Sequence, residues 1–286
     1  MLPSYLSKAQ VNRFIKNALS EDVGDGDHTS NGSIPENDQS KAKLLVKETG
    51  IIAGIELSKL IFEKIDPSLE IEYLVKDGDA VSTGEIGFHL QGNTRNILKA
   101  ERLVLNCLQR MSGIATYTFR LTQLTKGTKA RLLDTRKTTP NFRAMEKWAV
   151  LIGGGFNHRF GLFDMVLLKD NHIDYAGGVE NAITSTRKYL QENSLNLDIE
   201  IEVRNMMELE EVIETGSVKR VLLDNMLPSD MKSAIQLIDG KMETEASGGI
   251  NEENIREIAE TGVDYISIGA LTHSYKSLDI SLKAEK

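Results

Sequence analysis

The chain has little that would suit it to an oxidising compartment or to a membrane. A single cysteine, Cys107, stands among its 286 residues, so no intramolecular disulfide can form and a reducing compartment is expected. The first residues, MLPSYLSKAQVNRF, lack the apolar core and the small-residue cleavage site of a secretory signal. No apolar run approaches the roughly 20 residues that a membrane-spanning helix needs. These absences predict a cytoplasmic protein that has no membrane partner.

Two nucleotide-binding motifs are also missing. No G-x-G-x-x-G follows an early strand, which leaves a Rossmann dinucleotide site without support, and no Walker P-loop is present. The formal net charge of −8 argues against a general nucleic-acid binder, because such binding depends on neutralising phosphates with cations. A local cationic pocket is compatible with this acidic balance.

The first part of the chain predicts a small α+β domain. Apolar residues recur at helical spacing from Ala9 to Glu21, and a strong helix with one apolar stripe runs from about Asn96 to Ala115. Between them, Gly and Asp turns separate short strand-like runs. These runs are Ala42–Glu48, Ile51–Ile55, Ile71–Val75 and Ile86–Gln91.

From Lys129 onward the pattern changes to alternating strands and helices. The strand-like runs are Ala130–Asp134, Met165–Leu168, Ile199–Val203, Val218–Asp224, Glu243–Ala246 and Tyr265–Ile268. The helical segments between them include Val179–Leu190, Met207–Thr215 and Glu252–Thr261. Repeated strand–helix units with buried strands indicate a parallel sheet. Their number and short loops favour closure of this α/β sheet into a barrel.

Polar residues or glycines follow nearly every strand-like run of this second part. The motifs are Asp134–Thr138, Lys169–His172, Glu200 with Glu202, Asp224-Asn225, Ser247–Gly249 and Gly269–His273. A single Asp there is often a helix cap and a single Gly is often a turn. Six runs that share this change of polarity predict a site, because barrels carry function at the carboxyl ends of their strands and buried charges need partners.

One of these motifs predicts phosphate binding. Ser247-Gly248-Gly249-Ile250 runs directly into Asn251–Asn254, which we interpret as the start of a helix. Glycine amides at a helix N-terminus favour an anion. The next strand ends in Gly269, and barrels often bind phosphate between their last two strand ends.

Cations gather in the neighbouring motifs and are expected to converge on a ligand. They are Arg136, Lys137, His158, Arg159 and Lys169. Arginine forks suit carboxylates and phosphates, and lysine supplies a point charge.

Two features frame these cations in the sequence. Thr138–Pro140 predicts the start of a helix that carries Arg143, Lys147 and Trp148 and ends at Gly153–Gly155. Three glycines can merely end a helix, but before His-Arg we favour a mobile backbone that lets side chains meet a ligand.

Two carboxylates, Glu202 and Asp224, oppose the cations on neighbouring strand ends. They would repel a polyphosphate unless a hard cation intervened, and Mg²⁺ is the natural choice. They suit sugar hydroxyls equally well. Both roles point to a phosphorylated sugar.

These motifs resemble quinolinate phosphoribosyltransferase, and the resemblance covers nearly the whole chain. The segments that carry it are EDVGDGDHTS (21–30), ERLVLNCLQRMSGIATY (101–117), DTRKTTP (134–140), GGGFNHRFGLFDMVLLKDNHID (153–174), EASGGI (245–250) and DYISIGALTHS (264–274). The resemblance implies the conversion of quinolinate and phosphoribosyl pyrophosphate to nicotinate mononucleotide, CO₂ and pyrophosphate, with Mg²⁺, in de novo NAD biosynthesis. It also implies an N-terminal sandwich domain (1–114, with 275–286 joining it) and an incomplete, TIM-like α/β barrel (115–274).

The same resemblance implies a homodimer, or a higher homo-oligomer, whose sites are completed across the interface. Quinolinate would meet Arg102 of the partner chain together with Arg136, His158, Arg159 and Lys169. Phosphoribosyl pyrophosphate would meet Lys137, Glu202, Asp224, Ser247, Gly248, Gly249, Gly269 and His273. Lys137, Lys169, Glu202 and Asp224 would be catalytic, with Glu202 and Asp224 at the metal. Taken alone, Arg102 would be read as a solvated surface charge.

Three other functions stay open at this point. A Schiff-base aldolase would use Lys169 as its nucleophile. A phosphoribosyltransferase for another pyridine acid would share most of the site. A sensor of phosphorylated metabolites would bind sugar phosphates without turnover, which the density of both cations and carboxylates disfavours.

Overall fold

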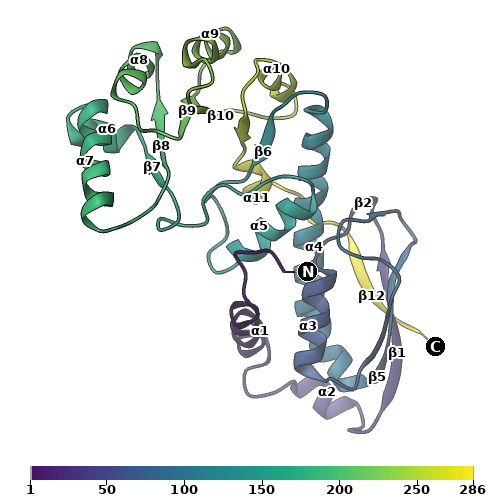
Figure 1. Ribbon diagram of the computed structural model, residues 1–286. Helices are drawn as coiled ribbons and strands as arrows, with labels where there is room; N and C mark the ends of the chain where they lie inside the picture. Colours follow the sequence, from purple (N-terminus) through teal and green to yellow (C-terminus); the bar gives the residue numbers. More distant parts are fainter. Residues whose placement is uncertain (1, 286) are drawn as a thin grey trace. The chain divides into compact units, whose positions relative to one another are not determined.

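The computed structural model describes residues 2–285, which form two compact units, each described by itself (Figure 1). The first unit contains the chain up to Phe119, the segment Thr138–Gly154 and the chain from Ser274 onward. The second contains Arg120–Lys137 and Gly155–His273. None of the helices within residues 2–285 combines the length and the hydropathy that crossing a bilayer requires.

The first unit is built on an antiparallel sheet with the strand order β12-β1-β5-β3. The strands are β1 (Gln39–Val46), β3 (Glu70–Tyr73), β5 (Ile86–Asn93) and β12 (Ile280–Glu285), and β2 (Gly50–Ile51) pairs separately with β4 (Ala80–Val81). Leu44 of β1 lies opposite Phe88 of β5 and Leu282 of β12, so the C-terminal strand closes one side of this sheet. Phe62 packs edge-on against Phe88 at 5.8 Å between ring centroids, which brings a helix onto the sheet.

Five helices accompany this sheet. They are α1 (Lys8–Val23), α2 (His28–Ser33), α3 (Ile55–Ile65), α4 (Thr94–Leu124) and α5 (Arg143–Ile152). The helices predicted at Ala9–Glu21 and Asn96–Ala115 are confirmed as α1 and α4, and α4 runs nine residues further than its periodicity indicated.

The strand predicted at Ile51–Ile55 is wrong beyond Ile51, because the chain turns into α3 there. Asp77 explains the turn: its carboxylate accepts the backbone N–H groups of Gly54, Ile55 and Glu56 at 2.7, 2.8 and 3.2 Å. A carboxylate that satisfies the first amides of a helix stabilises that helix end. This cap lies more than twenty residues away in the sequence, where local periodicity does not detect it.

The second unit is a six-stranded sheet in the order β6-β11-β10-β9-β8-β7, and every neighbouring pair is parallel. The strands are β6 (Arg131–Leu133), β7 (Val166–Leu168), β8 (Ile199–Val203), β9 (Arg220–Asp224), β10 (Glu243–Ser247) and β11 (Tyr265–Ser267). The helices are α6 (Asp170–Ala176), α7 (Val179–Glu192), α8 (Met206–Thr215), α9 (Pro228–Ile238), α10 (Ile255–Ala259) and α11 (Ala270–His273). Helices α7 to α10 line the outer side of the strands (Figure 1). The predicted parallel α/β architecture is confirmed.

The sheet does not close by pairing its two end strands, so the expectation of full closure is wrong and the incomplete barrel is right. Beside β6, the Phe156 backbone bridges to Leu133, with Phe156 N–H donating to Leu132 O at 2.8 Å and Asp134 N–H donating to Phe156 O at 3.1 Å. The glycine-rich segment before His158 therefore continues the sheet as a single bridge. Its sequence lacks the apolar run by which a strand would be predicted.

Replacing Asp77 by Ala should destabilise the protein, because three amides at the start of α3 lose their acceptor. We expect a loss of about 1–2 kcal/mol in the free energy of unfolding, measured by urea denaturation and circular dichroism. Glu214→Ala, at an exposed position on α8, is the control and should change little. Equal urea midpoints for Asp77→Ala and the parent protein would contradict the capping role.

Candidate active site

The carboxyl ends of the parallel strands bring the predicted polar motifs of the second unit to one edge of its sheet. The strand register pairs Ser247 at the end of β10 with Asp224 at the end of β9. Glu202 points from β8 on the same side as Glu200, two residues earlier, because side chains alternate along a strand. The strand ends therefore form one site rather than separate surface features.

The glycines after β10 form a tight turn, and at Gly248 no side chain would fit. Gly248 and Gly249 have φ values of 95° and 62°, and a side chain on Gly248 would overlap the Asn225 amide. Asn225 in turn donates from Nδ2 to Asp224 at 2.7 Å and from its backbone N–H to Ser247 O at 2.9 Å. The turn is thus tied to the end of β9, with the Asn225 side chain packed against Gly248.

The helix expected directly after these glycines starts later than predicted. Helix α10 begins at Ile255, and the side chains of Asn251 and Asn254 organise the residues before it. Asn254 accepts from Asn251 N–H at 2.8 Å and donates to Gly249 O at 3.1 Å. Asparagine side chains compete with the helix backbone for hydrogen bonds. An anion at this turn would therefore meet glycine amides without the end of a helix behind them.

Gly269, which follows β11, lies against the side chains of Lys137 and His273. A Cβ atom there would come within 2.8 Å of Lys137 Cδ and 3.0 Å of His273 Nε2. Thr272 holds the Lys137 backbone by donating to its carbonyl at 2.8 Å. Lys137 and His273 therefore share one corner of the site, next to the glycine.

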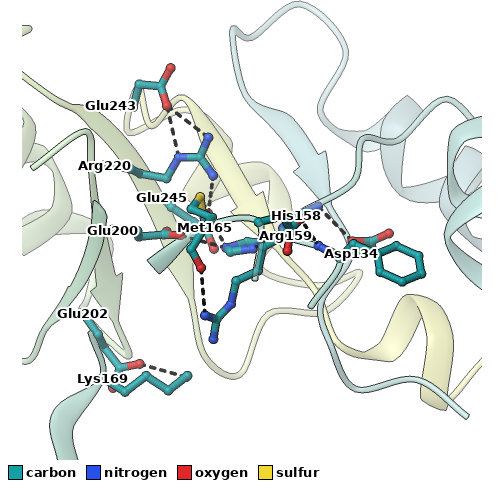
Figure 2. A network of polar contacts seen from close by, with 12 residues as sticks. Asp134, His158, Arg159, Met165, Lys169, Glu200, Glu202, Arg220, Glu243 and Glu245 are labelled. Atoms are coloured by element: carbon teal, nitrogen blue, oxygen red, sulfur yellow. Dashed lines mark hydrogen bonds and ion pairs between the residues drawn. The ribbon is translucent and has the colours of Figure 1, made fainter. Parts of the chain in front are cut away.

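Lys169 and Glu202 pair across the ends of β7 and β8. Lys169 Nζ lies 3.1 Å from Glu202 Oε2, and the lysine side chain is half exposed while the carboxylate is nearly buried (Figure 2). The pair neutralises a carboxylate that is otherwise shielded from solvent.

Arg159 faces a second guanidinium. It is half-buried, and its Nη1 donates to Met165 O at 3.2 Å (Figure 2). The pKa of Arg159 is lowered, first by burial and next by the nearby charge of Arg136. Arg136 itself is exposed, and the charges of Glu200 and Asp164 act on Arg159 in the opposite direction. Two guanidinium groups close together suit a ligand with more than one negative charge.

His158, predicted among these cations, is buried, and its contacts suit a ring with its proton on Nε2. The Arg159 backbone N–H donates to His158 Nδ1 at 2.7 Å, so this nitrogen carries a lone pair and the proton is on Nε2. Nε2 faces two fully buried carboxylates, 3.0 Å from Glu200 Oε2 and 3.5 Å from Glu245 Oε2 (Figure 2). Burial raises the pKa of both carboxyls to about 7.

His158, Glu200 and Glu245 are spaced as three metal ligands would be. The Nε2–H tautomer argues against that role, because a metal ligand needs a lone pair on the nitrogen. Both oxygens of Glu200 lack a hydrogen-bond partner, so their contact with the ring is one of proximity. Sequence reasoning placed Glu200 and Glu245 within motifs but gave them no role. Their alternation with buried apolar residues in β8 and β10 was the available signal.

Comparison with known proteins decides the family. The family model "Quinolinate phosphoribosyl transferase, C-terminal domain" matches residues 114–283, and the corresponding N-terminal domain model matches residues 27–112. The chain belongs to the quinolinate phosphoribosyltransferase family. The predicted activity, decarboxylating quinolinate phosphoribosyltransferase in NAD biosynthesis, and its class as a pentosyltransferase are confirmed at this level.

Relatives of this phosphoribosyltransferase match over nearly all of the chain. Quinolinate phosphoribosyltransferase [decarboxylating] 2a, mitochondrial, of Nicotiana tabacum is 50% identical over 283 residues, which cover 94% of this chain and 80% of that protein. The crystal structure of NadC from Streptococcus pyogenes is 38% identical with a TM-score of 0.91, covering 98% of this chain and 99% of that one. The nicotinate-nucleotide pyrophosphorylase structure from Francisella tularensis is 39% identical with a TM-score of 0.90, covering 98% of each chain.

Two sequence predictions concern residues of the first unit of this phosphoribosyltransferase. Arg102 lies exposed on α4. Its position within its own unit neither supports nor contradicts the predicted role in the site of a partner chain. The helix start predicted at Thr138–Pro140 lies instead at Arg143, because Asn141 takes a φ of 63° and interrupts the helix. Lys147 on this helix is fully buried rather than directed at a ligand.

Replacing Gly248 by Ala should weaken anion binding by this phosphoribosyltransferase. The new methyl group would displace Asn225 and shift the 248–249 amides, and we expect inorganic phosphate to bind about tenfold more weakly, or about 1.4 kcal/mol. Isothermal titration with phosphate measures the change. Gly262→Ala is the matched control, since Gly262 has a φ of 94° but open space around it. Phosphate affinity that is equal in both variants would contradict phosphate binding by the 248–249 amides.

Proposed function

We propose that the strand ends of the second unit bind quinolinate and phosphoribosyl pyrophosphate side by side and join them. The observation that carries the proposal is the exposed Arg136 close to the half-buried Arg159, whose pKa its charge lowers. A dicarboxylate would remove that repulsion by pairing with both guanidinium groups. Quinolinate presents two adjacent carboxylates on one ring, as this pair requires.

The quinolinate subsite would consist of Arg136, Arg159 and Lys169. The neutral His158 ring, which is almost completely buried, would form its floor and donate no charge. Arg102, exposed on α4, would enter from a partner chain, so that the site is complete only in a homodimer.

The phosphoribosyl subsite would lie along β9, β10 and β11. Backbone amides at Ser247, Gly248, Gly249 and Gly269 would hold the 5′-phosphate, with His273 beside it. Lys137, packed over Gly269, would contact the pyrophosphate. Glu202 and Asp224 would accept from the ribose hydroxyls.

The residues at this subsite fit Mg²⁺ that arrives with its substrate. Glu202 and Asp224 offer two carboxylates, and the three-ligand cluster found within residues 2–285 lies elsewhere, at His158. Mg²⁺ is commonly held by one or two carboxylates together with phosphate oxygens and waters. When bound, it would neutralise the leaving pyrophosphate.

The chemistry needs no nucleophile from the protein. As the bond between ribose and pyrophosphate breaks, positive charge develops on the sugar, and Lys137 stabilises the negative charge of the leaving group. The pyridine nitrogen forms the new bond and becomes a pyridinium. When the adjacent carboxylate then leaves as CO₂, the electron pair of the broken bond stays on the ring carbon, where the neighbouring positive nitrogen stabilises it. A proton from solvent adds to this carbon and gives nicotinate mononucleotide. The side chains position the two substrates and balance their charges.

The pairing of Lys169 with Glu202 disfavours the aldolase alternative, because a Schiff base requires a free amine. A cytoplasmic location stays a prediction, and the name of the Nicotiana tabacum relative places that protein in mitochondria.

The activity assay follows directly from the paired arginines. We expect quinolinate-dependent release of pyrophosphate and CO₂ that requires Mg²⁺, and turnover of nicotinate that is lower by about 10²-fold or more, because one carboxylate cannot neutralise two guanidinium groups. Quinolinate labelled with ¹⁴C in the departing carboxylate measures CO₂ release, and a coupled assay measures pyrophosphate with either acid. A preference for nicotinate would overturn the substrate assignment.

Sharing of sites between chains is tested by complementation. Arg102→Ala and Lys137→Ala should each be inactive, whereas mixed dimers of the two should regain up to about a quarter of the parent activity. Half of randomly mixed dimers contain both chains, and each of these has one intact site. Mass spectrometry verifies the mixing, and verified mixed dimers without activity would exclude a shared site.

A further inference from the structure

An ionic layer occupies the interior of the second unit, where a sheet of this kind usually packs aliphatic side chains. Glu200 of β8 and Glu243 of β10 lie beside Arg220 of β9 in the strand register. Arg220 contacts Glu243 Oε2 at 3.0 Å and Glu245 Oε2 at 3.2 Å, and the side chains of Glu200 and Glu245 are fully buried. Figure 2 shows this group running from Arg220 to His158.

The oxygen atoms of Glu245 are used unequally. Oε2 contacts both Arg220 Nη1 at 3.2 Å and His158 Nε2 at 3.5 Å, whereas Oε1 has no hydrogen-bond partner. A buried acceptor left unpaired costs free energy. Glu245 is therefore an expensive group to bury, and its Oε2 lies between Arg220 and the His158 ring.

The His158 ring fixes the backbone on its far side. Nδ1 accepts from the Arg159 N–H at 2.7 Å, while the His158 N–H donates to Asp134 Oδ1 at 2.9 Å. Asn157 also donates to Asp134, at 2.6 Å. The ring orientation thus sets the peptide from which the Arg159 side chain extends, and the carboxylates hold the ring by its opposite nitrogen.

We propose that Glu245 is a positioning residue for Arg159 and acts through His158. The carboxylate anchors His158 Nε2–H, the ring then holds the Arg159 amide, and the guanidinium is kept where it can meet a quinolinate carboxylate. The inference rests on the proposed binding of quinolinate by Arg159. Glu245 touches no substrate in this scheme.

Glu245 is a better test of this chain of contacts than Glu200. Glu200 neighbours Glu202 in β8 and affects the charge of Arg159 directly, so its removal would alter the site in two ways. Arg220 keeps its contact with Glu243 when Glu245 is changed.

Two variants of Glu245 separate positioning from charge. In Glu245→Gln the amide oxygen can take the place of Oε2 and keep both contacts, and the NH₂ group takes the place of the unpaired Oε1. Glu245→Leu removes the anchor. We expect the KM for quinolinate to stay within about threefold of the parent in Glu245→Gln and to rise about tenfold or more in Glu245→Leu, with the KM for phosphoribosyl pyrophosphate unchanged in both. A fall in kcat alone, or equal rises in both KM values, would overturn the proposal.

Coupling through His158 is measured by a double-mutant cycle. In a His158→Ala background, Glu245→Leu should add less than about twofold to the KM for quinolinate, because the connecting ring is gone. An effect as large as in the parent background would show that Glu245 acts by another route and would overturn the proposal.

The tautomer of His158 in the parent protein provides an independent test, which requires neither turnover nor a folded variant. Two-bond ¹H–¹⁵N NMR of the parent protein should show the Nε2–H tautomer of His158 at neutral pH, and Glu245→Gln should retain it. An Nδ1–H tautomer or an imidazolium would overturn the proposal. If the parent protein fails to turn over quinolinate, the proposed function fails, and the tautomer result still decides whether the carboxylates orient His158.

Discussion

The structure of the second unit depends on compensating charge inside a sheet that is mostly buried. Arg220, Glu243 and Glu245 form ion pairs within the strands, and Glu200 and His158 extend this ionic layer toward the carboxyl ends. Breaking one member of a buried ionic group is costly, because it leaves an uncompensated charge. The layer therefore links the strands β8, β9 and β10 to the segment that carries Arg159, and the positions of the site residues follow from it.

The charges at the strand ends divide into two kinds. Lys169 pairs with Glu202 at the strand ends, whereas the half-buried Arg159 has its pKa lowered by burial and by the charge of Arg136. Backbone amides near Gly248 add donors that carry no net charge. Such a division would let a sugar phosphate bind to the amides without disturbing the arginine pair.

Much of this arrangement was predictable from the sequence, for a physical reason. Buried parallel strands such as Val166–Leu168 are short apolar runs, and the polar residues after them must gather at one edge because parallel strands share a direction. What escaped prediction depends on contacts between distant residues. Asp77 starts helix α3 from more than twenty residues away, and Asn254 delays helix α10 through its own side chain.

The charge of His158 illustrates the same limit within the site. Its neighbours in the sequence, Asn157 and Arg159, suggest a cationic cluster, and only the placed Arg159 N–H reveals that Nδ1 is an acceptor. Sequence supplies the residue types at a strand end, but the protonation state follows from which groups face each nitrogen.

A neutral His158 also bears on how the site would discriminate between pyridine acids. With His158 uncharged, the positive charge that faces the ring carboxylates is concentrated in Arg136 and Arg159, whose mutual repulsion is already visible in the lowered pKa of Arg159. A ligand with one carboxylate would leave one guanidinium partly desolvated and unpaired, and such groups reject an incomplete ligand far more strongly than an apolar pocket rejects a missing methylene. The backbone amides near Gly248 cannot contribute to this choice, since either acid would react with the same phosphoribosyl pyrophosphate. Selection for a dicarboxylate would then reside in two arginines, and its sharpness would depend on how firmly the ionic layer holds one of them in place.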